Sequence, residues 1–200
     1  MKKLTFLIFS CILSLSAISA QAAIDPQPDG VGVYFDTEAS ALCHAPGNPV
    51  TCYLMFTNVT GERVMVFVCA VDVDTNLPVS SLGYWVHYGL DIAGPEDATT
   101  LVKNFAVGTE HGWDLTGDHY IAAWRTMLPL SPSDFVSFRV FPNEDYGGTD
   151  HLFYRDMSAG IDTQLHVVNG NADVPQTFIT SGDCVVANEA ITWSQLKALY

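Results

Sequence analysis

The segment whose spacing best suits metal chemistry follows a long apolar stretch. Asp72, Asp74 and Asn76 alternate along the chain, so on a continuing strand their side chains project to one face. Side-chain oxygens in this arrangement are ligands that calcium takes from proteins. An EF-hand loop would need glycine where Leu77 stands and glutamate where Gly83 stands. The spacing therefore predicts a looser calcium loop at the rim of a β-sheet, and a polar turn cap is the alternative.

A second pair of residues could bind a ligand by stacking. Trp85 and His87 alternate along a later apolar segment and fall on its more polar face. Aromatic rings exposed on a sheet form a platform for flat or apolar ligand faces, sugars among them. The alternative is that a loop or a second sheet covers both rings.

Sequence motifs for catalysis are absent. The chain has no Gly-x-Ser-x-Gly nucleophile elbow and no glycine-rich phosphate loop. Residues 110–114 and 118–119 bring two histidines and several carboxylates into one region, but their spacing matches no zinc site. No catalytic residue is predicted.

The first 22 residues have the layout of a secretory signal peptide. Lys2 and Lys3 precede an apolar run over residues 4–18, and Ala20 and Ala22 supply the small residues before a cleavage site. The run is shorter than the roughly 20 residues that span a bilayer. We expect residues 1–22 to be removed, and residues 23–200 to form one domain with no transmembrane anchor, in the periplasm or outside the cell.

The composition limits the partners of this domain. Acidic residues outnumber basic ones 22 to 8, for a net charge of −14, and loss of Lys2 and Lys3 with the leader makes it −16. Such a charge repels phosphate backbones, which argues against nucleic-acid binding. The same charge favours solubility and would attract a cation.

Short apolar runs separated by Gly, Pro, Asn and Asp clusters predict an all-β fold. The expected architecture is a single β-sandwich, immunoglobulin-like or jelly-roll-like. Residues 49–58 and 63–73 are expected to pair as a hairpin, and the second arm is apolar on both faces, which is typical of a covered central strand. Further strands are expected over residues 31–36, 83–92, 101–107, 119–128, 135–141, 151–154, 164–168 and 185–187.

Four cysteines remain after the leader: Cys43, Cys52, Cys69 and Cys184. An even number in an exported chain predicts two disulfides. The hairpin places Cys52 opposite Cys69 and leaves Cys43 to reach Cys184. The alternative joins Cys43 to Cys52 and Cys69 to Cys184, because directly opposed strand cysteines strain a disulfide.

The two ends of the domain carry a resemblance. Residues 192–195 fit a capping box and predict one short C-terminal helix. The stretches GVYFDTEA (residues 32–39) and TWSQLKALY (residues 192–200) resemble the ends of a loose group of secreted bacterial proteins for which no activity is established. The resemblance implies a β-sandwich and carries no function with it.

These patterns favour an exported, non-catalytic module that binds another protein, a glycan or a surface. One alternative is a secreted hydrolase with an acidic or metal-assisted site, so enzymatic activity is left open. Another is a structural component of the cell envelope or matrix. Calcium is the one cofactor that the sequence suggests. The choice among these functions is left open, because fold class alone does not determine function.

Overall fold

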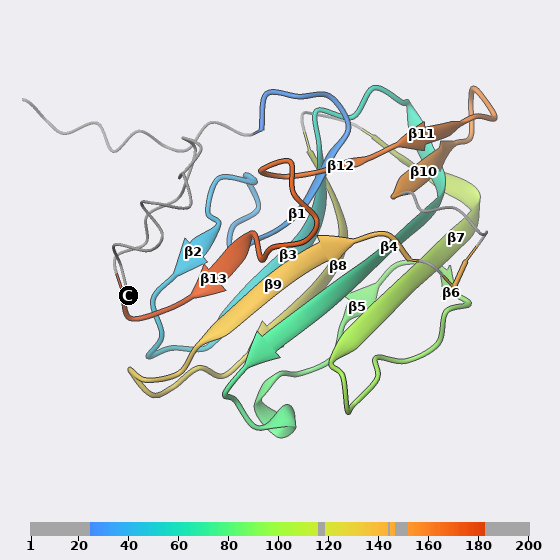
Figure 1. The fold of residues 1–200 in the computed structure, drawn as a ribbon. Coiled ribbons are helices and arrows are strands. Elements are labelled where there is room, and N and C mark those ends of the chain that lie inside the picture. Colours follow the sequence, from blue (N-terminus) through green and yellow to red (C-terminus); the bar gives the residue numbers. More distant parts are fainter. Residues whose placement is uncertain (1–24, 116–118, 144, 147–151, 183–200) are drawn as a thin grey trace, which may run out of the picture.

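The computed structural model describes residues 25–115, 119–143, 145–146 and 152–182. Their secondary structure consists of β-strands and one short 3₁₀-helix, η1 (Val79–Ser81). The strands form two facing sheets (Figure 1), which confirms the predicted all-β sandwich. The predicted signal peptide and C-terminal helix lie outside the described residues.

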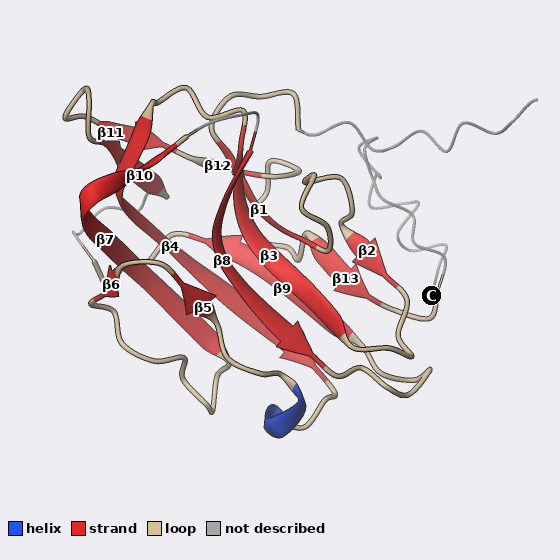
Figure 2. Ribbon diagram, turned by 180° about the vertical axis from the view of Figure 1, so that it is seen from behind, coloured by secondary structure: helices blue, strands red, loops and turns tan. Residues whose placement is uncertain are grey.

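Sheet A has five strands, and its centre, β3 and β8, is seen in Figure 2. All its pairs are antiparallel except the β1–β12 pair, which is parallel. In spatial order the strands are β12 (His166–Val167), β1 (Gly30–Tyr34), β3 (Val50–Thr57), β8 (His119–Met127) and β5 (Val86–His87).

Sheet B is organised around β4 (Arg63–Thr75). One edge of β4 pairs with β7, and the other edge is shared by β10 near its start and β9 near its end. The sheet continues from β7 to β6, from β10 to β11, and from β9 through β13 to β2. These strands are β2 (Cys43–His44), β6 (Leu90–Asp91), β7 (Val102–Asp114), β9 (Val136–Phe141), β10 (Phe153–Asp156), β11 (Asp162–Gln164) and β13 (Thr177–Ile179).

The core lies between the two sheets. Alternating apolar residues of β3, Leu54 and Phe56, face Phe67 and Cys69 of β4, and all four are fully buried. The rings of Phe56 and Phe67 meet edge to face with centroids 5.4 Å apart. Burying each large side chain contributes about 1.5–3 kcal/mol, so this inner layer holds the sheets together.

The predicted β3–β4 hairpin is wrong, because β3 lies in sheet A and β4 in sheet B. The connection over residues 58–62 does not close a tight turn, because its backbone amides donate hydrogen bonds to side chains elsewhere in the chain. The Thr60 amide donates to the carboxylate of Asp29 at 2.8 Å, and the Glu62 amide donates to that of Asp156 at 2.7 Å. Satisfying these amides outside the turn lets the chain cross from one sheet to the other.

Three other predicted strands differ from the structure, and the one predicted over residues 185–187 lies outside the described residues. Residues 164–168 are divided between β11 of sheet B and β12 of sheet A. Residues 83–92 form two short strands separated by Gly89, whose φ is +94°. A Cβ at Gly89 would lie 2.6 Å from the Gly108 carbonyl oxygen, so the turn depends on glycine. Strand β7 runs past the predicted end at Val107 to Asp114, so the acidic, histidine-bearing residues 110–114 belong to a strand.

Candidate functional site

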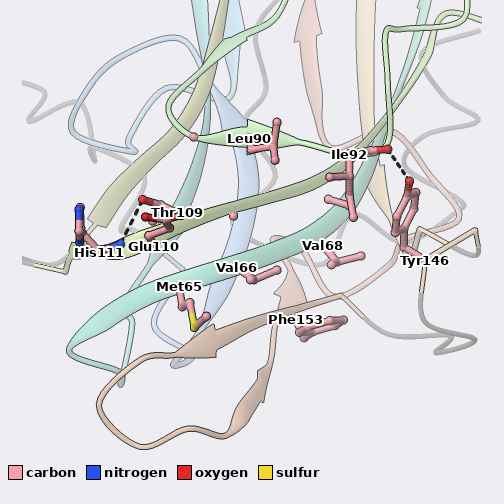
Figure 3. Close-up of a pocket in the computed structure, with 13 residues that line it drawn as sticks. Met65, Val66, Val68, Leu90, Ile92, Thr109, Glu110, His111, Tyr146 and Phe153 are labelled. Atoms are coloured by element: carbon pink, nitrogen blue, oxygen red, sulfur yellow. Dashed lines mark hydrogen bonds between the residues drawn. The ribbon is translucent and has the colours of Figure 1, made fainter.

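An apolar groove lies on the face of sheet B that points away from the core. It has a volume of about 720 Å³ and crosses β6, β7, β4 and β10. Figure 3 shows Leu90 and Ile92 beside β7 and Phe153 beyond β4. The lining comprises Met65, Val66, Val68, Gly89, Leu90, Ile92, Ala106, Gly108, Thr109, Glu110, His111, Tyr146 and Phe153.

The floor of the groove is built by the register of β4 and β7. Val66 lies opposite Gly108, and Val68 lies opposite Ala106. Residues between them, such as Phe67, turn into the core because successive strand side chains alternate in direction. Glycine and alanine on β7 keep the floor low.

Larger side chains border this floor. Leu90 of β6 pairs with Gly108, and the amide of Ile92 donates to the Ala106 carbonyl at 3.1 Å. On the opposite border, Phe153 of β10 pairs with Val68. Leu90 is 71 % and Ile92 61 % exposed. Together with Met65 they form a contiguous apolar surface, a feature that marks interaction sites on soluble proteins.

Few groups in the groove titrate. Among the described lining residues these are Glu110, His111 and Tyr146. The Tyr146 hydroxyl donates to the Ile92 carbonyl, and the His111 amide approaches the Thr109 hydroxyl at 3.5 Å (Figure 3). Glu110 is the only carboxylate among these lining residues. The remaining lining is mainly apolar, so the groove would bind a ligand chiefly through apolar contacts.

The residues predicted to bind calcium have protein partners. Asp72 accepts a hydrogen bond from the Arg139 guanidinium at 2.9 Å. Both ends of the Asn76 carboxamide are used, by the Ser133 carbonyl and by the amide of Phe135. Asp74 is exposed. Within the described ranges no three His, Cys, Asp or Glu residues group closely enough to hold a metal, and calcium binding stays a prediction.

Trp85 and His87 do not form a surface platform. Trp85 is 9 % exposed and packs edge to face on Phe105 at 5.6 Å, and the Arg125 guanidinium lies 5.2 Å from its ring. His87 lies 3.6 Å from a carboxylate oxygen of Asp91. They border a second cavity of about 340 Å³, which Asp91, Glu96 and Lys103 also line. Trp85 is thus largely covered by neighbouring segments, and His87 is half-buried.

The cysteines also differ from the prediction. Cys52 and Cys69 are free, buried thiols on β3 and β4, so neither predicted pairing forms in full. Burial raises the pKa of Cys52 to about 12 and raises that of Cys69 as well. Cys43 lies on β2, and its pairing with Cys184, which is outside the described residues, stays a prediction.

Sequence comparison identifies no relative: no family model and no curated protein matches the chain. Among the described residues, no helix is long and apolar enough to cross a membrane. Comparison of the fold with solved structures does give matches.

Cohesins are among the similar structures. The second type II cohesin module from the adaptor ScaA scaffoldin of Acetivibrio cellulolyticus has a TM-score of 0.49 at 8 % identity, with 81 % of this chain and 95 % of that chain covered. A type II cohesin domain from the cellulosome of the same organism has a TM-score of 0.41 at 13 % identity, with 81 % of this chain and 100 % of that chain covered. The third ScaB cohesin of R. flavefaciens, solved with a group 1 dockerin, has a TM-score of 0.40 at 12 % identity, with 78 % of this chain and 96 % of that chain covered. These TM-scores are below 0.5, so the likeness assigns no role to any residue here.

Sequence patterns contained one signal for the groove. The second arm of the expected hairpin is apolar on both faces, which predicted a covered strand. In the structure the outward face of β4 is only partly covered, with Val68 buried, Val66 half-buried and Met65 exposed. Leu90 and Ile92 could not be placed beside it from the sequence, because their position depends on the β6–β7 pairing.

Proposed function

We propose that this protein is an exported, non-catalytic binding module, and that a partner protein docks in the groove on sheet B. The observation that supports this most directly is the concave apolar surface bordered by the exposed side chains of Leu90 and Ile92. A partner that covered both residues would gain about 25 cal/mol for each Å² of apolar surface removed from water.

A protein fits this surface better than a glycan does. Sugar sites combine aromatic rings with several polar groups, whereas this floor offers Val66, Val68, Ala106 and Gly108. Glu110 alone supplies a carboxylate to the described lining, so the hydrolase alternative has no converging pair of acids there. The predicted signal peptide supports placing the protein in the periplasm or outside the cell.

Site-specific photo-crosslinking in the native host tests the docking site. A photo-reactive residue replaces Ile92 in one strain and Leu130 in a control strain. Leu130 is 58 % exposed, close to the 61 % of Ile92, but it follows β8 outside the groove. We expect one protein to be cross-linked from position 92 and not from position 130.

Binding measurements with the captured protein complete the test. Ile92→Ser should weaken binding about tenfold or more, because it removes a buried anchor of the interface, and Leu130→Ser should leave binding unchanged. No cross-link at position 92, or the same proteins at both positions, would refute docking in the groove.

A further inference from the structure

The width of the groove suits one α-helix. From β6 across β7 and β4 to β10 there are three strand spacings, or roughly 14 Å at about 4.8 Å each. A helix with its side chains is about 10–12 Å across. A helix lying along β4 and β7 would therefore fit between Leu90 and Ile92 on one border and Phe153 on the other.

The register sets the spacing of the helix's contacts. The groove consists of two rows, one through Gly108 and Val66 and the other through Ala106 and Val68. The rows are two strand residues apart, about 6.8 Å, and residues i and i+4 of a helix are separated by about 6 Å. Two apolar side chains one turn apart would thus meet one row each, as helices in apolar grooves commonly do.

The charge of the partner follows from the ion pairs of this chain. All five lysine and arginine residues of the described ranges already contact a carboxylate. The pairs are Arg63–Asp114, Lys103–Asp91, Arg125–Glu96, Arg139–Asp72 and Arg155–Asp162. Arg155 lies opposite Val66, at the end of the first row, and makes two hydrogen bonds with Asp162, at 2.6 and 3.0 Å. Arg63, which donates to the carbonyl of the lining residue His111, is also paired, so neither arginine beside the groove is left without a carboxylate.

Glu110 is the charged group left in the groove. It is exposed, it lines the groove beyond Gly108 on β7, where the register with β4 shifts, and no ion pair engages it among the described residues. Figure 3 shows it at the end of the groove away from Val68, so it lies beyond the first row. A cation of the partner at that level would meet an uncompensated carboxylate in a chain of net charge −14.

We infer that the groove takes an amphipathic helix of the partner protein, with two apolar side chains at i and i+4 and a lysine or arginine one turn further toward Glu110. The inference rests on the proposed function and specifies its partner. Glu110 sets the direction in which the helix lies, since the opposite direction would leave the carboxylate without a cation.

Fluorescence anisotropy with synthetic helical peptides tests this. The probe is a labelled alanine-rich helix with leucines at i and i+4 and lysine at i+8, and the comparison peptides carry glutamate at i+8 or leucines at i and i+2. The protein variants are Glu110→Lys and, as a control with the same charge change, Glu38→Lys on the exposed β1–β2 connection.

We expect the lysine peptide to bind the wild type and to lose about fivefold in affinity with Glu110→Lys, the scale of one surface ion pair. Glu38→Lys should have little effect, and the glutamate peptide should prefer Glu110→Lys. Equal losses with both variants would show that net charge alone acts, and would overturn the inference. So would equal binding of the i, i+2 peptide, or no binding at millimolar concentration.

The two proposals fail separately. A protein cross-linked at position 92 together with no peptide binding would refute the helix and retain the docking site. The absence of a cross-link would refute the docking site itself, whichever peptide binds.

Discussion

Replacing Arg125 should destabilise the fold more than replacing Arg155, an exposed arginine that also pairs with a carboxylate. Arg125 is fully buried, and its guanidinium donates to the carbonyls of Leu82 and Gly83, both at 3.0 Å. It also makes two hydrogen bonds with the Glu96 carboxylate, at 2.8 and 3.3 Å. These contacts tie the connection that follows η1 to the interior of the sandwich.

The expected loss follows from what Arg125→Met leaves behind. Methionine fills similar space but donates no hydrogen bond, so two carbonyls and the largely buried carboxylate of Glu96 lose their partner. Removing one partner of a buried ion pair costs about 3–5 kcal/mol. For a domain of this size that is a fall in Tm of roughly 6–20 °C.

Arg155→Met is the matched control. Arg155 also makes two hydrogen bonds with one carboxylate, that of Asp162, but both side chains are half exposed. Water can replace those bonds, and exposed pairs contribute little. Urea unfolding followed by circular dichroism gives both free energies of unfolding. Similar small losses in the two variants would refute the claim that burial makes the Arg125 pair essential.

Three further expectations concern other residues. Cys52 and Cys69 should resist iodoacetamide at pH 8 in the native protein, because burial keeps both thiols protonated. After denaturation both should react without a reductant. If they reacted only after reduction, they would be joined in a disulfide. Burial raises the pKa of Asp156, but hydrogen bonds from backbone amides lower it by more. Its folded pKa is thus below the unfolded one, and the stability that it gives above about pH 4 is lost as the pH falls through the folded pKa; Asp156→Asn should flatten the acid side of the stability curve, and an unchanged slope would contradict this. If calcium binds at Asp72 and Asp74, saturation at about 100 times its Kd should add about 2.7 kcal/mol of stability, which the double alanine variant should lose; equal melting in calcium and in chelator would exclude the site.

Strand prediction succeeded where side chains alternate between core and solvent. β9 was expected over residues 135–141 and is formed by Val136–Phe141, with Val136, Phe138 and Val140 in the core. β2 and β13 were missed because two or three residues are too few to show a period.

Pairing partners could not be predicted from the same pattern. Cys52 and Cys69 were placed opposite each other because their strands are consecutive, yet the two strands lie in different sheets. The change of sheet depends on Asp29 and Asp156, which accept hydrogen bonds from the intervening connection. The sequence of residues 58–62 does not indicate those partners, because Asp29 and Asp156 lie far away along the chain.

The charge of the chain and its exposed groove are consistent with each other. An open apolar surface such as that around Leu90 and Ile92 promotes self-association unless something opposes it. Two copies that met at this surface would each bring an excess of carboxylates, including Glu110, and every described lysine and arginine is already paired. Repulsion between copies would therefore oppose self-association at the groove. A partner that supplies a cation would gain from the same field, so the negative charge would both disfavour a second copy and favour the basic helix proposed above.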